Sequence, residues 1–84
     1  MVYKENIMKT KLSQQYKNLT LNIIKLRKEN NLSKKEMAQI LHISSYSLNK
    51  IEKGELPPSL NIDIVFYIEK HFNIPPHKLF HNSQ

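Results

Sequence analysis

The stretch HISSYSLNKIEKG, residues 42–54, decides how the rest of the chain is interpreted. Its first half is rich in poor helix formers, namely Ser44, Ser45, Tyr46, Ser47 and Asn49. Ser44, however, is a good N-cap, and Leu48 and Ile51 are three residues apart, so they share one face of a helix. Gly54 is the residue type that commonly follows a helix end. The stretch therefore predicts a short helix of about three turns with a buried stripe and a polar outer face.

Another short helix is expected immediately before this stretch. Ser33-Lys-Lys-Glu36 is a capping box, in which the serine hydroxyl and the glutamate carboxylate each accept a hydrogen bond from a backbone N–H. The inner face of the helix that it opens consists of Met37, Ala38 and Leu41. The connection His42-Ile43-Ser44 is tight. Two short helices joined in this way form a helix-turn-helix pattern, whose second helix can enter the major groove of DNA.

Further upstream, a helix is expected to begin at Thr20 or Asn22, since either side chain can cap it, and to end near Asn30-Asn31. Apolar residues also recur at helical spacing across its expected start: Met8, Leu12, Tyr16, Leu19 and Ile23. Residues 1–19 hold four lysines and one glutamate, which makes this segment dense in positive charge. Two alternatives stay open for it: a helical extension or a basic arm.

Downstream of Pro57-Pro58, Ser59 or Asn61 can start another helix. Its apolar residues lie at spacings of one, three and four, and they are Ile64, Val65, Ile68 and Phe72. Pro75-Pro76 then precedes a last helical turn whose apolar side holds Ile74, Leu79 and Phe80. No segment alternates as a strand does. The predicted fold is therefore all-α, a compact bundle of about five short helices with an extra N-terminal helix or arm.

Composition limits the function. The 84 residues suffice for one small domain, and the absence of cysteine rules out disulfides and thiolate metal sites. The net charge of +6 favours a polyanionic partner, first nucleic acid and second an anionic membrane. No apolar run approaches the length of a membrane span, so the protein is expected to be cytoplasmic and to have no membrane partner.

An enzyme is not expected, because the chain has no glycine-rich phosphate loop and no cysteine nucleophile. His77 and His81 are four residues apart and could share a helix face, but a third metal ligand is not evident. The sequence therefore predicts neither a cofactor nor a metal.

Most of residues 20–80 resembles the phage-repressor and Cro-type (xenobiotic response element-like) helix-turn-helix family. The matching residues are Leu26-Arg27, Leu32-Ser33, Glu36-Met37-Ala38, Ile43-Ser44, Ser47-Leu48, Ile51-Glu52-Lys53-Gly54, Pro58, Phe72-Asn73-Ile74 and Leu79-Phe80. The resemblance implies a lambda-repressor-like DNA-binding domain over residues 20–80, followed by a tail at 81–84. It implies a sequence-specific transcriptional regulator, a repressor, which binds double-stranded DNA as a homodimer. Antitoxins and adaptors with protein partners share this fold and remain the alternative.

The resemblance also assigns residues. Ser45, Tyr46 and Lys50 match positions that contact base edges, and Asn49 adjoins them. Five further residues complete the expected site. Lys34 lies at a position that touches phosphate or an outer base, Ser44 starts the helix, and Lys53 lies near phosphate. Arg27 is expected to pair with Glu52. By donor and acceptor pattern, Lys50 suits guanine and Asn49 suits adenine.

His42 departs from the family, which often has glycine at this turn, a position that tends to need a positive φ. Replacement of His42 by glycine is therefore expected to be tolerated or stabilising.

Overall fold

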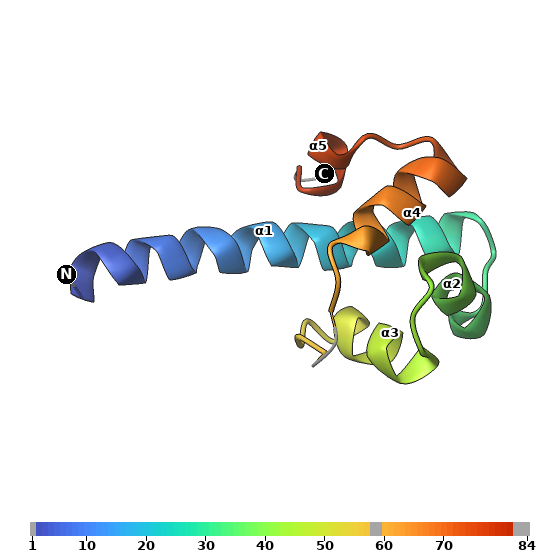
Figure 1. Cartoon of the computed structure of the whole chain (residues 1–84), viewed down its shortest axis with the longest axis horizontal. Coiled ribbons are helices and arrows are strands. Elements are labelled where there is room, and N and C mark those ends of the chain that lie inside the picture. The colour runs from blue at the N-terminus through green and yellow to red at the C-terminus, as the bar shows by residue number, and fades with distance from the viewer. Residues whose placement is uncertain (1, 58–59, 82–84) are drawn as a thin grey trace.

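The part of the chain that the structure describes contains five α-helices (Figure 1). The computed structural model describes residues 2–57 and 60–81, with side chains from Gln14 onward. The helices are α1 (Val2–Glu29), α2 (Lys34–Leu41), α3 (Ser45–Glu52), α4 (Asp63–Phe72) and α5 (Pro76–Leu79). Within these ranges there is no strand, so the predicted all-α class is confirmed.

The first helix runs through the segment for which the sequence left a helical extension and a basic arm open. It runs without a break from Val2, so the predicted start at Thr20 or Asn22 is wrong. The Thr20 hydroxyl instead donates to the Lys17 carbonyl at 2.8 Å, one turn back in the same helix. In Figure 1 the N-terminal part of α1 extends past the other helices. The side chains of Met8 and Leu12, which belong to the predicted apolar stripe, lie outside the described residues.

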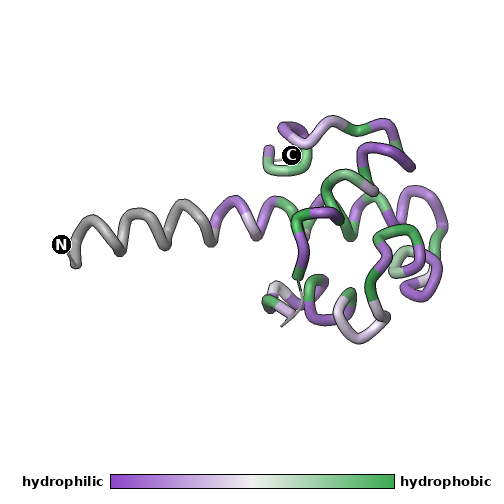
Figure 2. Tube along the Cα trace, viewed as in Figure 1, coloured by the Kyte–Doolittle hydropathy of each residue, from purple (hydrophilic) through white to green (hydrophobic). Residues whose placement is uncertain are grey.

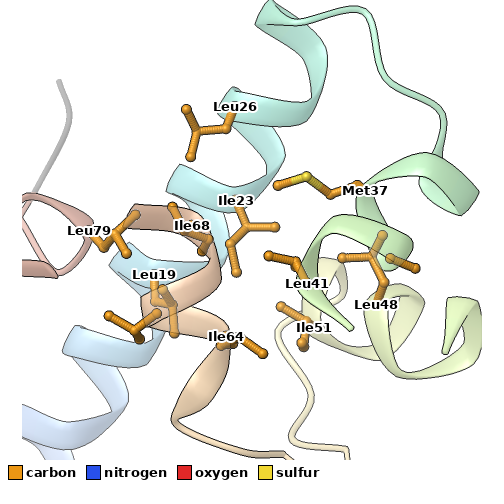
Figure 3. Packing of buried hydrophobic residues seen from close by; sticks show 12 residues of the cluster. Leu19, Ile23, Leu26, Met37, Leu41, Leu48, Ile51, Ile64, Ile68 and Leu79 are labelled. Carbon is orange, nitrogen blue, oxygen red and sulfur yellow. The ribbon is translucent and has the colours of Figure 1, made fainter. Parts of the chain in front are cut away.

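Each helix contributes its apolar stripe to one core. Figure 2 shows polar residues between the apolar ones along the helices of the domain, as expected for amphipathic helices. The buried set comprises Leu19, Ile23, Leu26, Met37, Ala38, Leu41, Leu48, Ile51, Ile64, Val65, Ile68 and Leu79. In Figure 3, Ile23, Leu41 and Ile51 converge from α1, α2 and α3. Helix α3, which carries the outward polar face, is therefore packed directly on the centre of the domain.

The start of α2 has the predicted capping box. The Glu36 N–H donates to Ser33 Oγ at 3.0 Å, and the Ser33 N–H donates to Glu36 Oε1 at 2.8 Å. The bond from the Ser33 backbone, helped by its hydroxyl, lowers the pKa of Glu36. The box is therefore complete while Glu36 is ionised. It loses its charge-assisted bond as the pH falls through that lowered pKa.

The turn between α2 and α3 has the predicted left-handed residue. His42 has φ 59° and ψ 39°, and its N–H donates to the carbonyls of Ala38 and Gln39. Its ring also stacks on the Tyr67 ring of α4, with 3.8 Å between centroids and 5° between planes. The stack was not predicted. It joins the turn to a helix outside the motif and offsets the strain of a positive φ.

The variant His42→Gly is expected to change the free energy of unfolding by no more than about 1 kcal/mol. Glycine relieves about 1 kcal/mol of backbone strain but removes a ring stack of similar value. His42→Ala keeps the strain and loses the stack, so it should be the less stable variant. Urea unfolding of the two variants and the wild type measures both effects. Equal stability of the alanine and glycine variants would contradict this balance.

Helix α4 begins two residues later than the later of its predicted starts. Its first residue is Asp63, whose N–H donates to Asn61 Oδ1 at 2.9 Å, so Asn61 initiates the helix from outside it. Ser59, the other predicted start, lies outside the described residues. The connection from α3 is thus longer than a short turn, consistent with the two prolines in it.

The closing segment has the predicted form, and α1 holds it in place. Pro76 is the first residue of α5, and Leu79 is buried. Asn22 Nδ2 donates to the carbonyls of Leu79 at 2.6 Å and His81 at 3.1 Å. One turn earlier, Asn18 Nδ2 donates to the Phe80 carbonyl at 3.1 Å. These two asparagines satisfy carbonyls that end a very short helix.

Candidate nucleic-acid interface

Helix α3 is short and has an anchored inner face. Its N-cap is Ser44, whose Oγ accepts from the Ser47 N–H at 3.0 Å. It ends at Glu52 after eight residues, and Gly54 follows with φ 81°. The helix thus has a little over two turns, so the predicted three turns were too many. Leu48 and Ile51 have no exposed surface, and this burial compensates for the low helix propensity of the serines around them.

An ion pair connects α3 to α1. Arg27 Nε donates to Glu52 Oε2 at 2.7 Å, and Arg27 Nη2 donates to Glu52 Oε1 at 3.0 Å. The same guanidinium reaches the Leu32 carbonyl through Nη1 at 3.3 Å, just before α2. The two side chains are only 15% and 8% exposed. A bidentate ion pair of this kind sets both the distance and the orientation of α3 relative to α1.

The opposite side of α3 is polar and open. Ser45, Tyr46 and Lys53 are exposed, and Asn49 and Lys50 are half-buried. The Tyr46 side chain is 64% exposed, so it does not cover the edge of the core. Helical geometry places these residues away from Leu48 and Ile51. Among the described residues, this face therefore combines hydroxyl, amide and ammonium groups with an aromatic ring.

Two lysines on this side are engaged with neighbours. Lys34 Nζ, at the start of α2, donates to Asn49 Oδ1 at 3.0 Å. Lys50 Nζ lies 3.2 Å from Glu55 Oε1 and 5.3 Å from the centre of the Tyr46 ring. The hydrogen bond to Glu55, with a smaller contribution from Tyr46, raises the pKa of Lys50. Lys50 is therefore a cation with an intramolecular competitor for any phosphate or base that it meets.

We expect Glu55→Gln to increase affinity for DNA by about two- to fivefold, because it removes this competitor and a negative charge beside the polar face. Fluorescence anisotropy with a labelled duplex at low salt measures the change. Glu69→Gln on α4, which removes the same charge at another exposed position, is the matched control. If both variants gain equally, net charge explains the increase and the Lys50–Glu55 contact does not matter.

Sequence reasoning missed Tyr16. Its hydroxyl donates to the Glu55 carbonyl at 2.7 Å, and burial raises the pKa of this phenol. The contact holds the segment after α3 against α1, and with it the residue that pairs with Lys50. Tyr16 did stand out as part of the apolar stripe of α1. No local pattern, however, indicates a partner 39 residues away.

The two histidines at a spacing of four do not lie on one helix. His77 lies in α5, whereas His81 lies beyond the end of that helix at Leu79. The part of the chain that the structure describes contains no group of three or more potential metal ligands. Within the same part, no helix is both long and apolar enough to cross a membrane.

Residues 21–84 match the family model described as a helix-turn-helix domain. The chain belongs to this helix-turn-helix family. In this helix-turn-helix domain α2 and α3 are the two helices of the motif, joined at His42. A helix-turn-helix domain indicates a DNA-binding regulator. Neither a curated protein nor a solved structure matches the chain.

Proposed function

We propose that this protein is a sequence-specific transcriptional regulator, a repressor, that inserts α3 into the major groove of DNA. The observation that carries the proposal is the two-sided construction of α3. Its inner face is fixed by Leu48, Ile51 and the Arg27–Glu52 ion pair. Its outer face consists of exposed or half-buried polar groups, whose inter-residue contacts are made by side chains at the surface, Lys34 to Asn49 and Lys50 to Glu55. A rigidly held helix with a polar face outside the core is what base recognition requires.

Each outward residue has a role in this proposal. Ser45, Tyr46 and Lys50 contact base edges, with Lys50 suited to the two acceptors of guanine. Ser44 contributes the helix N-terminus, which favours a phosphate. Lys34 and Lys53 contact the backbone, where Lys acts as a point charge. Asn49 lies between the base-contacting residues, and its role depends on its hydrogen bond with Lys34.

A homodimer is part of the proposal, because one short helix contacts too few base pairs for useful specificity. Two copies place their helices about one turn of DNA apart on a two-fold site. The first candidate for the dimer surface is α4 with the closing segment, where Ile62 and Phe66 are 66% and 58% exposed. The N-terminal part of α1 is the second. Such a dimer would repress by occupying a promoter, in the cytoplasm and on the nucleoid.

Selection of bound sequences from a random DNA pool tests the function. We expect a palindrome whose half-sites lie about one helical turn apart, because a two-fold dimer imposes its symmetry on the site. Enrichment of a single half-site would support sequence-specific binding but contradict the proposed dimer. Recovery of unrelated sequences would overturn the proposal.

The alternative is an antitoxin- or adaptor-type module that binds a protein. The observation in its favour is an exposed apolar surface: Ile62 is 66% exposed and lines a hollow together with Tyr16 and Leu60. The dependence of affinity on salt separates the two functions. Binding to DNA weakens steeply as salt rises, because each phosphate contact releases counterions. Binding through an apolar surface does not weaken in this way.

A further inference from the structure

The contact between Lys34 and Asn49 fixes the orientation of the Asn49 side-chain amide. Lys34 Nζ lies 3.0 Å from Asn49 Oδ1. An ammonium group can only donate, so the amide must turn its oxygen toward Lys34 and its NH₂ group away. That NH₂ group has no acceptor among the described residues, and it is not a buried unsatisfied group either. It is therefore exposed to solvent on the outward side of α3.

This orientation changes the recognition chemistry expected of Asn49. A two-point contact with adenine needs the amide oxygen to accept from N6 while the NH₂ group donates to N7. In this protein the oxygen already accepts from Lys34. An adenine or cytosine amino group placed here would have to share the Asn49 oxygen with the Lys34 ammonium, whose positive charge disfavours a second donor beside it. Guanine presents only acceptors, O6 and N7, on its major-groove edge.

We propose that Lys34 is a specificity-determining residue, which turns Asn49 into a donor and so makes this part of α3 select guanine over adenine. The inference rests on the proposed function, because it needs α3 in the major groove. It adds two statements to that function: the preferred base edge presents two acceptors, and Lys34 is the residue that imposes this preference. Lys34 acts here through Asn49, in addition to any contact with phosphate.

The test measures base preference. Random-pool selection is run on the wild type and on Lys34→Met, which keeps most of the apolar stem but removes the ammonium. The wild type should select guanine at the position under Asn49. The variant should shift toward adenine there, changing the ratio of the two affinities by at least about fivefold, the lower end of what one good base contact contributes.

Two further variants make the test specific. Lys35→Met removes the same charge from the next residue, which is exposed and makes no hydrogen bond to α3 among the described residues. It should keep the preference for guanine. In an Asn49→Ala background, Lys34→Met should no longer alter the preference, because the amide that it orients is gone. Thermal unfolding should show that all these variants remain folded, since the substituted residues lie outside the core.

The possible failures are distinct. If the wild type selects no sequence, the proposed function fails. If it selects a defined site and Lys34→Met selects the same base at every position, only the inference about Lys34 is overturned. A shift that persists in the Asn49→Ala background would also overturn it, because Lys34 would then contact the base directly.

Discussion

Arg27→Ala is expected to lower the free energy of unfolding by about 3 to 5 kcal/mol. The variant would leave the Glu52 carboxylate, in a side chain only 8% exposed, without the two guanidinium bonds that it accepts. A buried charge that loses its partner retains the desolvation penalty without the compensating attraction. Chemical denaturation at neutral pH measures the loss. Helix α3 would also lose its fixed position, so affinity for DNA should fall even at temperatures where the variant is folded.

The double variant shows whether the pair acts as a unit. With Glu52→Ala added, no stranded charge remains, so the double variant should lose much less than the sum of the two single losses. Lys28→Ala is the control, because Lys28 is an exposed basic residue in the same last turn of α1. It should change stability by less than about 0.5 kcal/mol. Simple additivity of the Arg27 and Glu52 variants would disprove the coupling.

Tyr46→Ala and Lys50→Ala are each expected to weaken binding to the selected operator by about tenfold or more, from the usual contribution of one base contact. The double variant should lose a factor of about 10² or more in affinity for the operator if the two contacts are independent. Both side chains lie outside the core, so thermal stability should stay close to that of the wild type. Affinity for random duplex should fall less, because it rests on phosphate contacts from many residues.

Titrations of operator and random duplex at several salt concentrations provide the measurement. Loss of Lys50 should reduce the salt dependence of binding by about one phosphate equivalent if it also touches the backbone. Lys70→Ala on α4 removes an exposed lysine outside the motif and is the control for net charge. Unchanged operator affinity in both Tyr46 and Lys50 variants would mean that α3 is not the recognition helix.

The features that could be predicted from the sequence are those whose partners are close along the chain. The capping box joins Ser33 to Glu36, and the cap of α3 joins Ser44 to Ser47, each across three residues. Gly54 and His42 have the positive φ expected at helix ends, since only a few residue types tolerate it. The apolar stripes follow from helical periodicity, which depends on spacing alone.

Local capping chemistry also explains the wrong start predicted for the first helix. Thr20 and Asn22 are good caps in isolation, yet both lie in the middle of α1. Asn22 is available for α5 only because the two segments meet in space, 57 residues apart along the chain at the Leu79 carbonyl. A residue type that can cap a helix can equally bind the backbone of another segment. Which of the two it does depends on the groups that the tertiary structure places around it.

The sequence by itself determined the helical class, the position of the turn, the inner stripes and the polar composition of the outward face, because these depend on neighbours within about one helical turn. Only the tertiary structure decided how that face is presented. It brought Lys34 to Asn49 and the Tyr16 hydroxyl to the segment that follows α3. The physical reason is that these contacts join different helices or the segments between them. Their geometry follows from how the whole core packs rather than from any local spacing.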